Sequence, residues 1–387
     1  MDARVQERKK NMLKSTGNGQ KILEKSLSTY LGSRDRGFES RSPDQKPAVF
    51  STKPGGFSLF IASQFSLSGQ VVNHWLCFTS QIVAKSTTGR CTTFSLSGIV
   101  FYIQILPKEN HMEQKLKCNG ELVTINAHKI HIYRAGNTDA PIIVFMSGHC
   151  TVSPVYDFKV LYEKLLQDFR IIVIEKFGYG YSDIWDSPCD IDTLLSIQRQ
   201  ALAALGETGP YILAPHSMSG LEAIRWKQMY PNEVSAIIGI DMATPLSFRI
   251  WTGEEIKKTV RLMRVLRKLK LASVLSSVST LALTEHEIRQ HKILKKRNVF
   301  NICCVNEAID VLNNASVVGE CGNIQCPVLL FSSNGEDQEK DWVENQQKFA
   351  EIMGARLISY DCGHYIHHFH SDEMCKEITE FAKSLEC

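Results

Sequence analysis

The sequence predicts an α/β fold, in which a mostly parallel central sheet is flanked by helices and carries an inserted helical cap. From about residue 121, short apolar segments alternate with segments of helical period. Strands that are apolar along their whole length are typical of a parallel sheet covered on both faces. The alternation stops between residues 245 and 322, where the sequence is largely helical and basic. A helical segment inserted between two such strands usually forms a cap.

The predicted elements follow one another in a regular order. Residues 121–125 and 129–133 form two short strands, joined by a turn at 126–128 as in a hairpin. Further strands are expected at 141–146, 170–175, 211–214, 234–240, 328–332 and 355–360. Helices are expected at 156–166, 191–205, 219–230 and 374–385, and Pro231 ends the third of them.

The 245–322 segment contains one amphipathic stretch with a basic face. Its apolar residues recur at helical spacing, at Ile256, Val260, Met263, Leu266 and Leu269. Its basic residues are Lys257, Lys258, Arg261, Arg264, Arg267, Lys268 and Lys270. A basic amphipathic helix can lie on a membrane surface, so weak membrane contact through the cap is one interpretation. We favour a cap over the site.

Residues 1–111 do not continue the α/β pattern. They mix polar and basic residues with isolated apolar clusters, and only 63–68 and 92–97 resemble short strands, without a convincing partner. The string Gly-Ser-Arg-Asp-Arg-Gly-Phe-Glu-Ser-Arg-Ser-Pro at 32–43 resembles the conceptual translation of a transfer-RNA gene. We interpret 1–111 as translated non-coding DNA preceding a true start at Met112, or as a disordered extension, and 112–387 as the folded domain.

Composition excludes several classes of protein. A net charge of +3 does not indicate a nucleic-acid partner, which usually needs a concentrated basic patch. The 12 cysteines form no C-x-x-C pair in a chain of 387 residues, which favours reduced thiols in the cytoplasm. No segment reaches the roughly 18 to 20 apolar residues that span a bilayer.

The strongest functional signal is the sequence Pro-His-Ser-Met-Ser-Gly at 215–220, between a predicted strand and a predicted helix. A nucleophile on such a tight turn needs small residues two positions before and after it, usually in the pattern G-x-S-x-G. Here Pro215 and Ser219 occupy those positions, so the residues differ from the usual glycines, but the place of the turn between a strand and a helix agrees with the pattern. The alternative is an ordinary turn in which Ser217 caps the helix.

Together with the motifs around it, this turn resembles the α/β-hydrolase superfamily over about residues 121–387. The family often has His-Gly-x after the strand where this chain has Ser-Gly-His at 147–149. The resemblance implies an oxyanion hole formed by the amides of His149 and Met218. The sequence Glu-Lys-Phe-Gly-Tyr-Gly-Tyr-Ser at 175–182 resembles the D-x-x-G-x-G-x-S turn of the family, with Glu175 in place of the aspartate. That turn is structural more than catalytic.

His364 is the expected general base. It lies in the sequence Asp-Cys-Gly-His after the last predicted strand, where the family places its catalytic histidine. A serine hydroxyl is a weak nucleophile until an imidazole removes its proton. His367, His368 and His370 follow closely, but their spacing does not match a regular metal motif, so no metal and no cofactor is expected.

Two positions compete for the acid of the triad. The family usually supplies it after the strand that here ends in Ser-Ser-Asn-Gly-Glu-Asp at 332–337, which offers Asp337 and Glu336. The alternative is Asp241 in Gly-Ile-Asp-Met-Ala at 239–243, similar to a Gly-Leu-Asp-Pro-Ala string in some lipases. We favour Asp241 over Asp337. Without a triad role, Asp241 would hydrogen-bond the turn that follows its strand.

These residues predict a serine hydrolase that cleaves an ester, thioester, lactone or amide through an acyl-serine intermediate. One alternative is a non-catalytic ligand-binding protein with the same pocket, which the loose flanks Pro215 and Ser219 allow. Another is a metal-dependent enzyme that uses the histidine-rich run. The partner expected is a small-molecule substrate, and no residue selects among substrates.

Overall fold

The computed structural model describes residues 49–50, 58–60, 82–85, 91–94 and 116–385. The chain divides into two compact units. One unit contains four short antiparallel strands, β1 (Val49–Phe50), β2 (Ser58–Phe60), β3 (Ile82–Lys85) and β4 (Cys91–Phe94). The strand expected at 92–97 therefore has a partner, β3, contrary to the prediction, while 63–68 lies outside the described residues.

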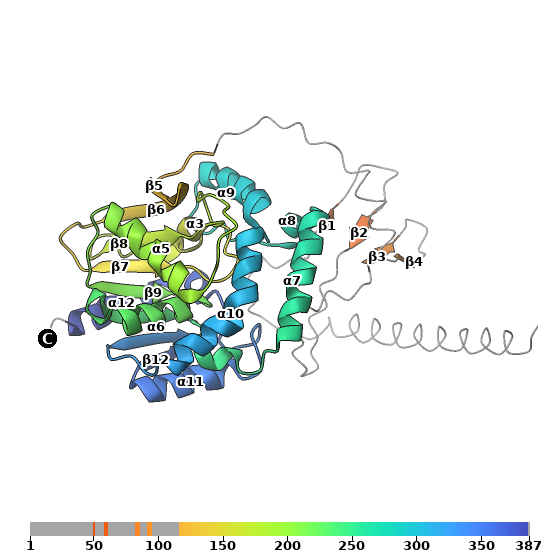
Figure 1. Cartoon of the computed structure of the whole chain (residues 1–387). Coiled ribbons are helices and arrows are strands. Elements are labelled where there is room, and N and C mark those ends of the chain that lie inside the picture. Colours follow the sequence, from red (N-terminus) through yellow and green to blue (C-terminus); the bar gives the residue numbers. More distant parts are fainter. Residues whose placement is uncertain (1–48, 51–57, 61–81, 86–90, 95–115, 386–387) are drawn as a thin grey trace, which may run out of the picture. The chain divides into compact units, whose positions relative to one another are not determined.

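The other unit is built on an eight-stranded sheet in the order β12-β11-β10-β9-β7-β8-β6-β5 (Figure 1). Its strands are β5 (Glu121–Ile125), β6 (His128–Gly136), β7 (Ile142–Met146), β8 (Arg170–Glu175), β9 (Tyr211–Pro215), β10 (Val234–Ile240), β11 (Val328–Ser332) and β12 (Arg356–Ser359). The six strands β7 to β12 pair in parallel with their neighbours, whereas β6 pairs antiparallel with both β5 and β8. The predicted α/β fold with a mostly parallel sheet is confirmed.

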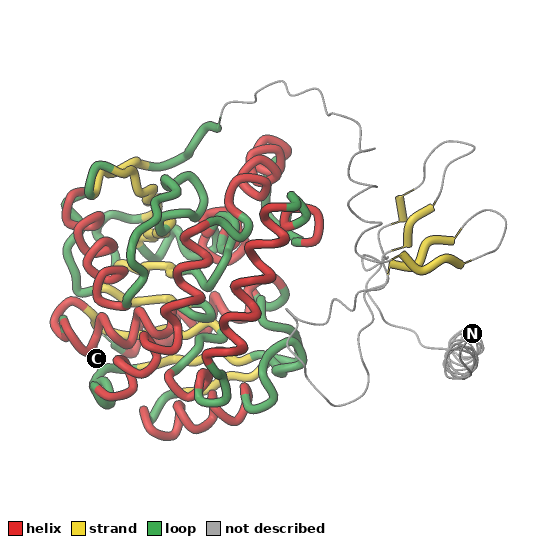
Figure 2. The backbone as a smooth tube through the Cα atoms, turned by 45° about the vertical axis from the view of Figure 1, so that its right-hand side comes forward, coloured by secondary structure: helices red, strands yellow, loops and turns green. Residues whose placement is uncertain are grey.

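Helices connect the strands and cover both faces of the sheet. They are α3 (Pro154–Asp157), α4 (Lys159–Tyr162), α5 (Ile191–Ala204), α6 (Ser219–Met229), α11 (Trp342–Met353), α12 (Ser371–Ser384) and the 3-10 turns η2 (Pro231–Glu233) and η4 (Ile366–His368). Alternate residues of one strand enter different cores. Val144 and Met146 of β7 pack with α5 and α6, and Ile143 and Phe145 pack with α4 and α12. Figure 2 shows the strands of this sheet enclosed between helices.

The helix predicted at 156–166 is wrong in its extent. The structure has two one-turn helices there, separated by Phe158, whose backbone (φ −83°, ψ −5°) departs from a regular helix. The Phe158 side chain is fully buried and packs on Phe145, with ring centroids 5.1 Å apart. Packing of this ring in the core is a tertiary interaction, so the helical spacing of the sequence does not predict it.

The segment between β10 and β11 is helical, as its sequence predicts. It contains η3 (Pro245–Phe248), α7 (Gly253–Lys268), α8 (Ala272–Leu275), α9 (Glu285–Asn298) and α10 (Ile302–Glu320). On α7, Val260 and Met263 are buried, and Ile256 and Leu266 pack against the core. The apolar face of α7 is therefore turned inward. None of the helices among the described residues combines the length and apolarity that crossing a membrane requires.

Candidate active site

Ser217, the predicted nucleophile, lies on a strained turn between β9 and α6. Its φ of 54° is in the left-handed region, which a residue with a side chain rarely adopts. Such strain persists where the surrounding structure enforces it, and it is common at functional sites. The Ser217 amide donates to the carbonyl of Ile240, and its carbonyl accepts from Ala243, so β10 holds the turn. Ser217 is half-buried, whereas His216 and Ser219 beside it are buried.

Small residues surround the turn, as this geometry demands. A Cβ atom added to Gly148 would lie 2.6 Å from the Cβ of Ser217, and one added to Gly220 would lie 2.1 Å from the carbonyl oxygen of Ala243. Ser219 fits at the flank because its hydroxyl is satisfied internally. It donates to the carbonyls of Met146 and His216, at 2.7 and 2.9 Å. The departure from the usual glycine is therefore accommodated by packing and hydrogen bonding.

His364 is bound to Asp241, the acid that the sequence analysis favours. Its Nδ1 lies 2.6 Å from Oδ2 of Asp241. Asp241 is fully buried, and its Oδ1 accepts from the Ser333 amide and from Nε1 of Trp342, both at 2.9 Å. Burial by itself would lower the pKa of His364, but the hydrogen bond and charge of Asp241 outweigh burial and raise that pKa. An imidazole held in this way carries its proton on Nδ1 and leaves Nε2 free to accept one.

Asp337, the competing acid, contacts the backbone of His364 instead of its ring. Its two carboxylate oxygens lie 3.1 and 3.2 Å from the His364 amide nitrogen. A Cβ atom added to Gly363 would lie 2.8 Å from this carboxylate, so the loop before His364 passes close to Asp337. Asp337 therefore fixes the position of the loop. Glu336, the other candidate in that loop, makes its local contact through its amide, which donates to Asn334.

His216 connects the turn of Ser217 with the loop of His364. Its ring lies 4.6 Å from the His364 ring, between centroids, and its Nε2 lies 3.2 Å from the His364 carbonyl oxygen. Burial holds the pKa of His216 well below its ordinary value, so the ring is neutral near pH 7. The structure thus brings Ser217, His364 and Asp241 to one edge of the sheet, at the carboxyl ends of β9, β10 and β12.

Solved structures share this arrangement of strands and helices. The haloalkane dehalogenase DbeA from Bradyrhizobium elkani USDA94 superposes with a TM-score of 0.56 and 16% identity, over 69% of this chain and 98% of DbeA. The enol-lactonase from Burkholderia xenovorans LB400 superposes with a TM-score of 0.50 and 17% identity, over 68% of this chain and 100% of the lactonase. The chain has the α/β-hydrolase fold.

One relative of this chain aligns with it in sequence over most of its length. Uncharacterized protein YbdG of Bacillus subtilis (strain 168) is 28% identical over 322 residues, which are 79% of this chain and 97% of YbdG. No family model matches the chain. The resemblance that the motifs suggest is confirmed for the fold.

The predicted oxyanion loop, residues 147–149, follows β7 and, with Cys150 after it, is held by the helical insertion. Among the described residues, neither the His149 amide nor the Met218 amide has a hydrogen-bond partner, so both are available as donors. The next amide, that of Cys150, donates to the hydroxyl of Tyr179 at 2.9 Å. The same hydroxyl donates to Glu307 of α10. Nε2 of the His149 ring lies 2.8 Å from the carbonyl oxygen of Cys304, also on α10.

Glu175 is structural, as the α/β-hydrolase resemblance implies. Its fully buried carboxylate accepts from the Ser153 hydroxyl at 2.7 Å and from the Tyr181 amide at 2.8 Å, and it pairs with Nδ1 of His131 at 2.9 Å. A Cβ atom added to Gly180 would lie 1.7 Å from this carboxylate, so only glycine fits there. Glutamate therefore organises the turn at 175–182 in place of the usual aspartate.

Sequence reasoning missed several residues of the site. Trp342 donates to Asp241 across 101 positions of sequence, and no local pattern indicates that contact. Lys176 is buried between Glu222 and Glu307, at 2.8 and 2.9 Å, and this ion-pair cluster joins the sheet, α6 and α10. The Trp342–Asp241 contact and the Lys176 cluster both involve helices that come together only when the chain folds. His367 and His368 contact Asp157, not the His364–Asp241 pair.

Proposed function

We propose that this chain is a serine hydrolase that cleaves an ester, thioester, lactone or amide through an acyl-serine intermediate. The observation that carries the proposal is the 2.6 Å contact between His364 Nδ1 and Asp241, beside a serine on a strained strand-to-helix turn. Strain and a buried carboxylate–imidazole pair are both unfavourable in a turn without a function. Their coincidence at one sheet edge supports a nucleophile with its base.

The proposed reaction begins with attack of the Ser217 hydroxyl oxygen on the carbonyl carbon of the substrate. Nε2 of His364 takes the hydroxyl proton, while Asp241 holds the tautomer and stabilises the imidazolium. The amides of His149 and Met218 donate to the oxygen that becomes negative. The imidazolium then gives its proton to the leaving alcohol, thiol or amine, and the acyl-serine forms. Water, activated by His364, releases the acid and restores Ser217.

The structural neighbours support hydrolysis as the reaction class. Both solved structures described above are named for enzymes that break bonds in small molecules, a haloalkane dehalogenase and an enol-lactonase. At 16% and 17% identity they share only the fold with this chain, so the substrate class is argued from the serine and its partners. A hydroxyl nucleophile with an imidazole base suits acyl transfer.

A fluorophosphonate probe tests this function directly. We expect the purified full-length chain to be labelled on Ser217 and to hydrolyse p-nitrophenyl acetate. Ser217→Ala should abolish labelling and lower turnover by about 10⁴-fold or more. Ser196→Ala is the matched control, because Ser196 is exposed on α5, away from the site, and it should behave like wild type.

A folded wild-type protein that the probe does not label would contradict the proposal. That result would favour the alternative of a non-catalytic ligand-binding protein with the same fold. If the protein is labelled, rates on matched ester, thioester, lactone and amide substrates give the substrate class, since the leaving group alone changes among them.

A further inference from the structure

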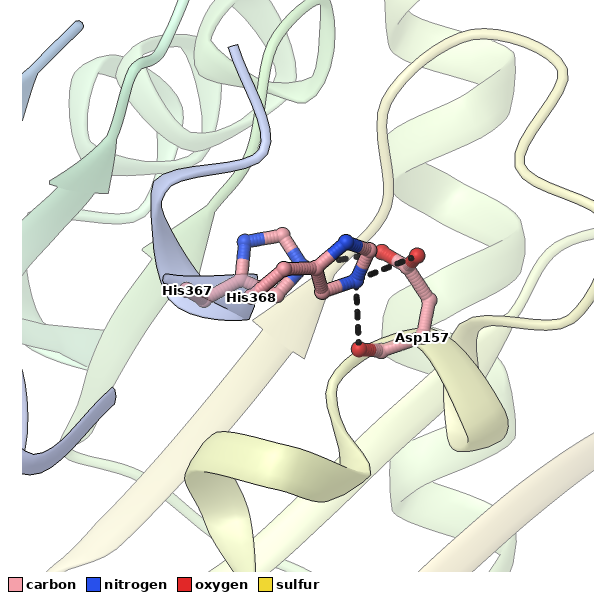
Figure 3. Close-up of side chains that lie close together, drawn as sticks. All are labelled: Asp157, His367 and His368. Atoms are coloured by element: carbon pink, nitrogen blue, oxygen red, sulfur yellow. Dashed lines mark hydrogen bonds and ion pairs between the residues drawn. The ribbon is translucent and has the colours of Figure 1, made fainter. Parts of the chain in front are cut away.

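A second cluster of ionisable side chains lies next to the candidate active site and consists of Asp157, His367 and His368. Asp157 is the last residue of α3, and His367 and His368 belong to η4, the turn that follows the loop of His364. The first and last members are 211 positions apart in the sequence. Figure 3 shows that both imidazoles point toward the Asp157 carboxylate. The spacing of the histidines alone did not indicate a metal site, because the third side chain comes from a distant element.

The distances in this cluster suit a metal ion. Nε2 of His367 lies 3.1 Å from Oδ2 of Asp157, and Nε2 of His368 lies 3.2 Å from Oδ1. Ligand bonds to zinc measure about 2.0–2.2 Å for these atom types, which places two ligands of a tetrahedral ion about 3.4 Å apart. One donor atom from each of the three side chains lies within 4.8 Å of the other two. Nε2 of His368 also lies 3.3 Å from the Asp157 carbonyl oxygen, a contact that a bound cation would replace.

The charge of the cluster also favours a cation. Asp157 is buried, and within residues 116–385 no lysine or arginine pairs with its carboxylate. The carboxylate instead faces two imidazole nitrogens, which are common ligands of transition metals. The surroundings are aromatic, since the Phe158 ring lies 5.2 Å from the His367 ring, between centroids. Buried carboxylates are normally paired with a charge or coordinate a metal.

The donor atoms indicate which ion would bind. Two imidazole nitrogens and one carboxylate oxygen suit zinc and neighbouring transition metals better than calcium or magnesium, which prefer oxygen ligands. Three protein ligands leave one tetrahedral position for water. The side chains of Asp157 and His368 are 10% and 11% exposed, so the cluster borders on solvent. We propose that Asp157, His367 and His368 bind one Zn²⁺ ion.

The place of the cluster in the fold assigns the ion a structural role. The centroid of the His367 ring lies 5.2 Å from that of the His216 ring, so the cluster is next to His216. A bound ion would join α3 to the turn after His364, two segments that the contacts of Asp157 with His367 and His368 already link. By binding only the folded chain, the ion would stabilise the fold.

Metal content and thermal unfolding of the full-length chain test this site. Protein produced with added zinc and then dialysed exhaustively should retain one equivalent, measured by mass spectrometry of the metal. His370→Gln is the matched control, because His370 lies two residues beyond His368 and stacks on Tyr360 outside the cluster. It should retain the equivalent, whereas Asp157→Asn and His368→Gln should lose it. At a hundredfold excess of Zn²⁺ over Kd, the wild-type Tm should rise by roughly 5–10 °C.

Cysteines are the alternative source of zinc binding, and cobalt distinguishes them. Nine cysteines within residues 116–385 are free thiols, at Cys118, Cys150, Cys189, Cys303, Cys304, Cys321, Cys326, Cys362 and Cys375. Co²⁺ in the proposed site should give visible d–d bands without the charge-transfer band of a thiolate ligand. Zinc retained equally by Asp157→Asn and His368→Gln overturns the proposal, and so does a wild-type content no higher than that of these variants. Should Asp157→Asn not fold, His368→Gln decides by itself, since its side chain is at the surface edge of the cluster.

Discussion

Replacing the two candidate acids with their amides tests the candidate site most sharply. Asp241→Asn keeps an acceptor for the Ser333 amide and Trp342, which both contact Oδ1, but it places an amide NH₂ against Nδ1 of His364 in place of Oδ2. An NH₂ group can only donate there, so Nδ1 must become the acceptor and the proton moves to Nε2. The imidazole is then in the wrong tautomer to take the proton of Ser217. We expect turnover to fall by about 10⁴-fold, or about 5 kcal/mol of transition-state stabilisation.

Asp337→Asn should have a much smaller effect, because Asp337 hydrogen-bonds the His364 amide, at 3.1 and 3.2 Å, and not its ring. An asparagine oxygen can still accept that hydrogen bond, so the loss is limited to the negative charge of Asp337, which assists that bond and helps to raise the pKa of His364. We expect a decrease of no more than about tenfold, which corresponds to about 1.4 kcal/mol.

Turnover of p-nitrophenyl acetate at saturating substrate is the measurement for both variants, with circular dichroism to establish that each is folded. Active-site labelling should persist weakly in Asp337→Asn and become very slow in Asp241→Asn. The reasoning is refuted if Asp337→Asn loses as much turnover as Asp241→Asn, or more. Equal and mild effects in both would contradict a triad built on either carboxylate.

Three further predictions concern the surroundings of the site. Tyr179→Phe removes the hydroxyl between the Cys150 amide and Glu307, so kcat should fall by roughly tenfold with KM nearly unchanged; an equal rise in KM would contradict a role in positioning the oxyanion loop. Because His364 must be unprotonated to act as a base and Asp241 raises its pKa, kcat/KM should decline toward acid with an apparent pKa above about 6.5. A wild-type decline centred below pH 6 would contradict this. Leu266→Ser on the inward face of α7 should lower Tm and change the ratio of kcat/KM between short and long acyl esters. If only binding to lipid vesicles changes, α7 is a membrane-surface helix and not part of a cap.

Local sequence patterns determined most of the fold. The bounds of β8, β10 and β11 follow from apolar runs of the right length, and those of β5 follow from partial apolar/polar alternation; the structure places these strands where they are expected. The hairpin turn is equally local, since Asn126 and Ala127 both adopt positive φ. Helix α11 was not predicted, because the polar Gln346 interrupts its apolar face. In the structure Gln346 is buried and donates to the Met242 carbonyl at 2.6 Å.

In the candidate site, too, some residues could be predicted from the sequence and others only from the tertiary structure. Ser217 and His364 are recognisable because each is embedded in a short motif whose small residues the turn requires. The choice between Asp241 and Asp337 depends on the distance from each carboxylate to one ring, and adjacent parallel strands deliver both to the same edge. The Asp157 cluster depends on a contact across 210 positions. Strands, turns and short motifs form within a few residues, so the local sequence determines them. Contacts between distant residues form only when their segments pack into a shared core, so the tertiary structure decides them.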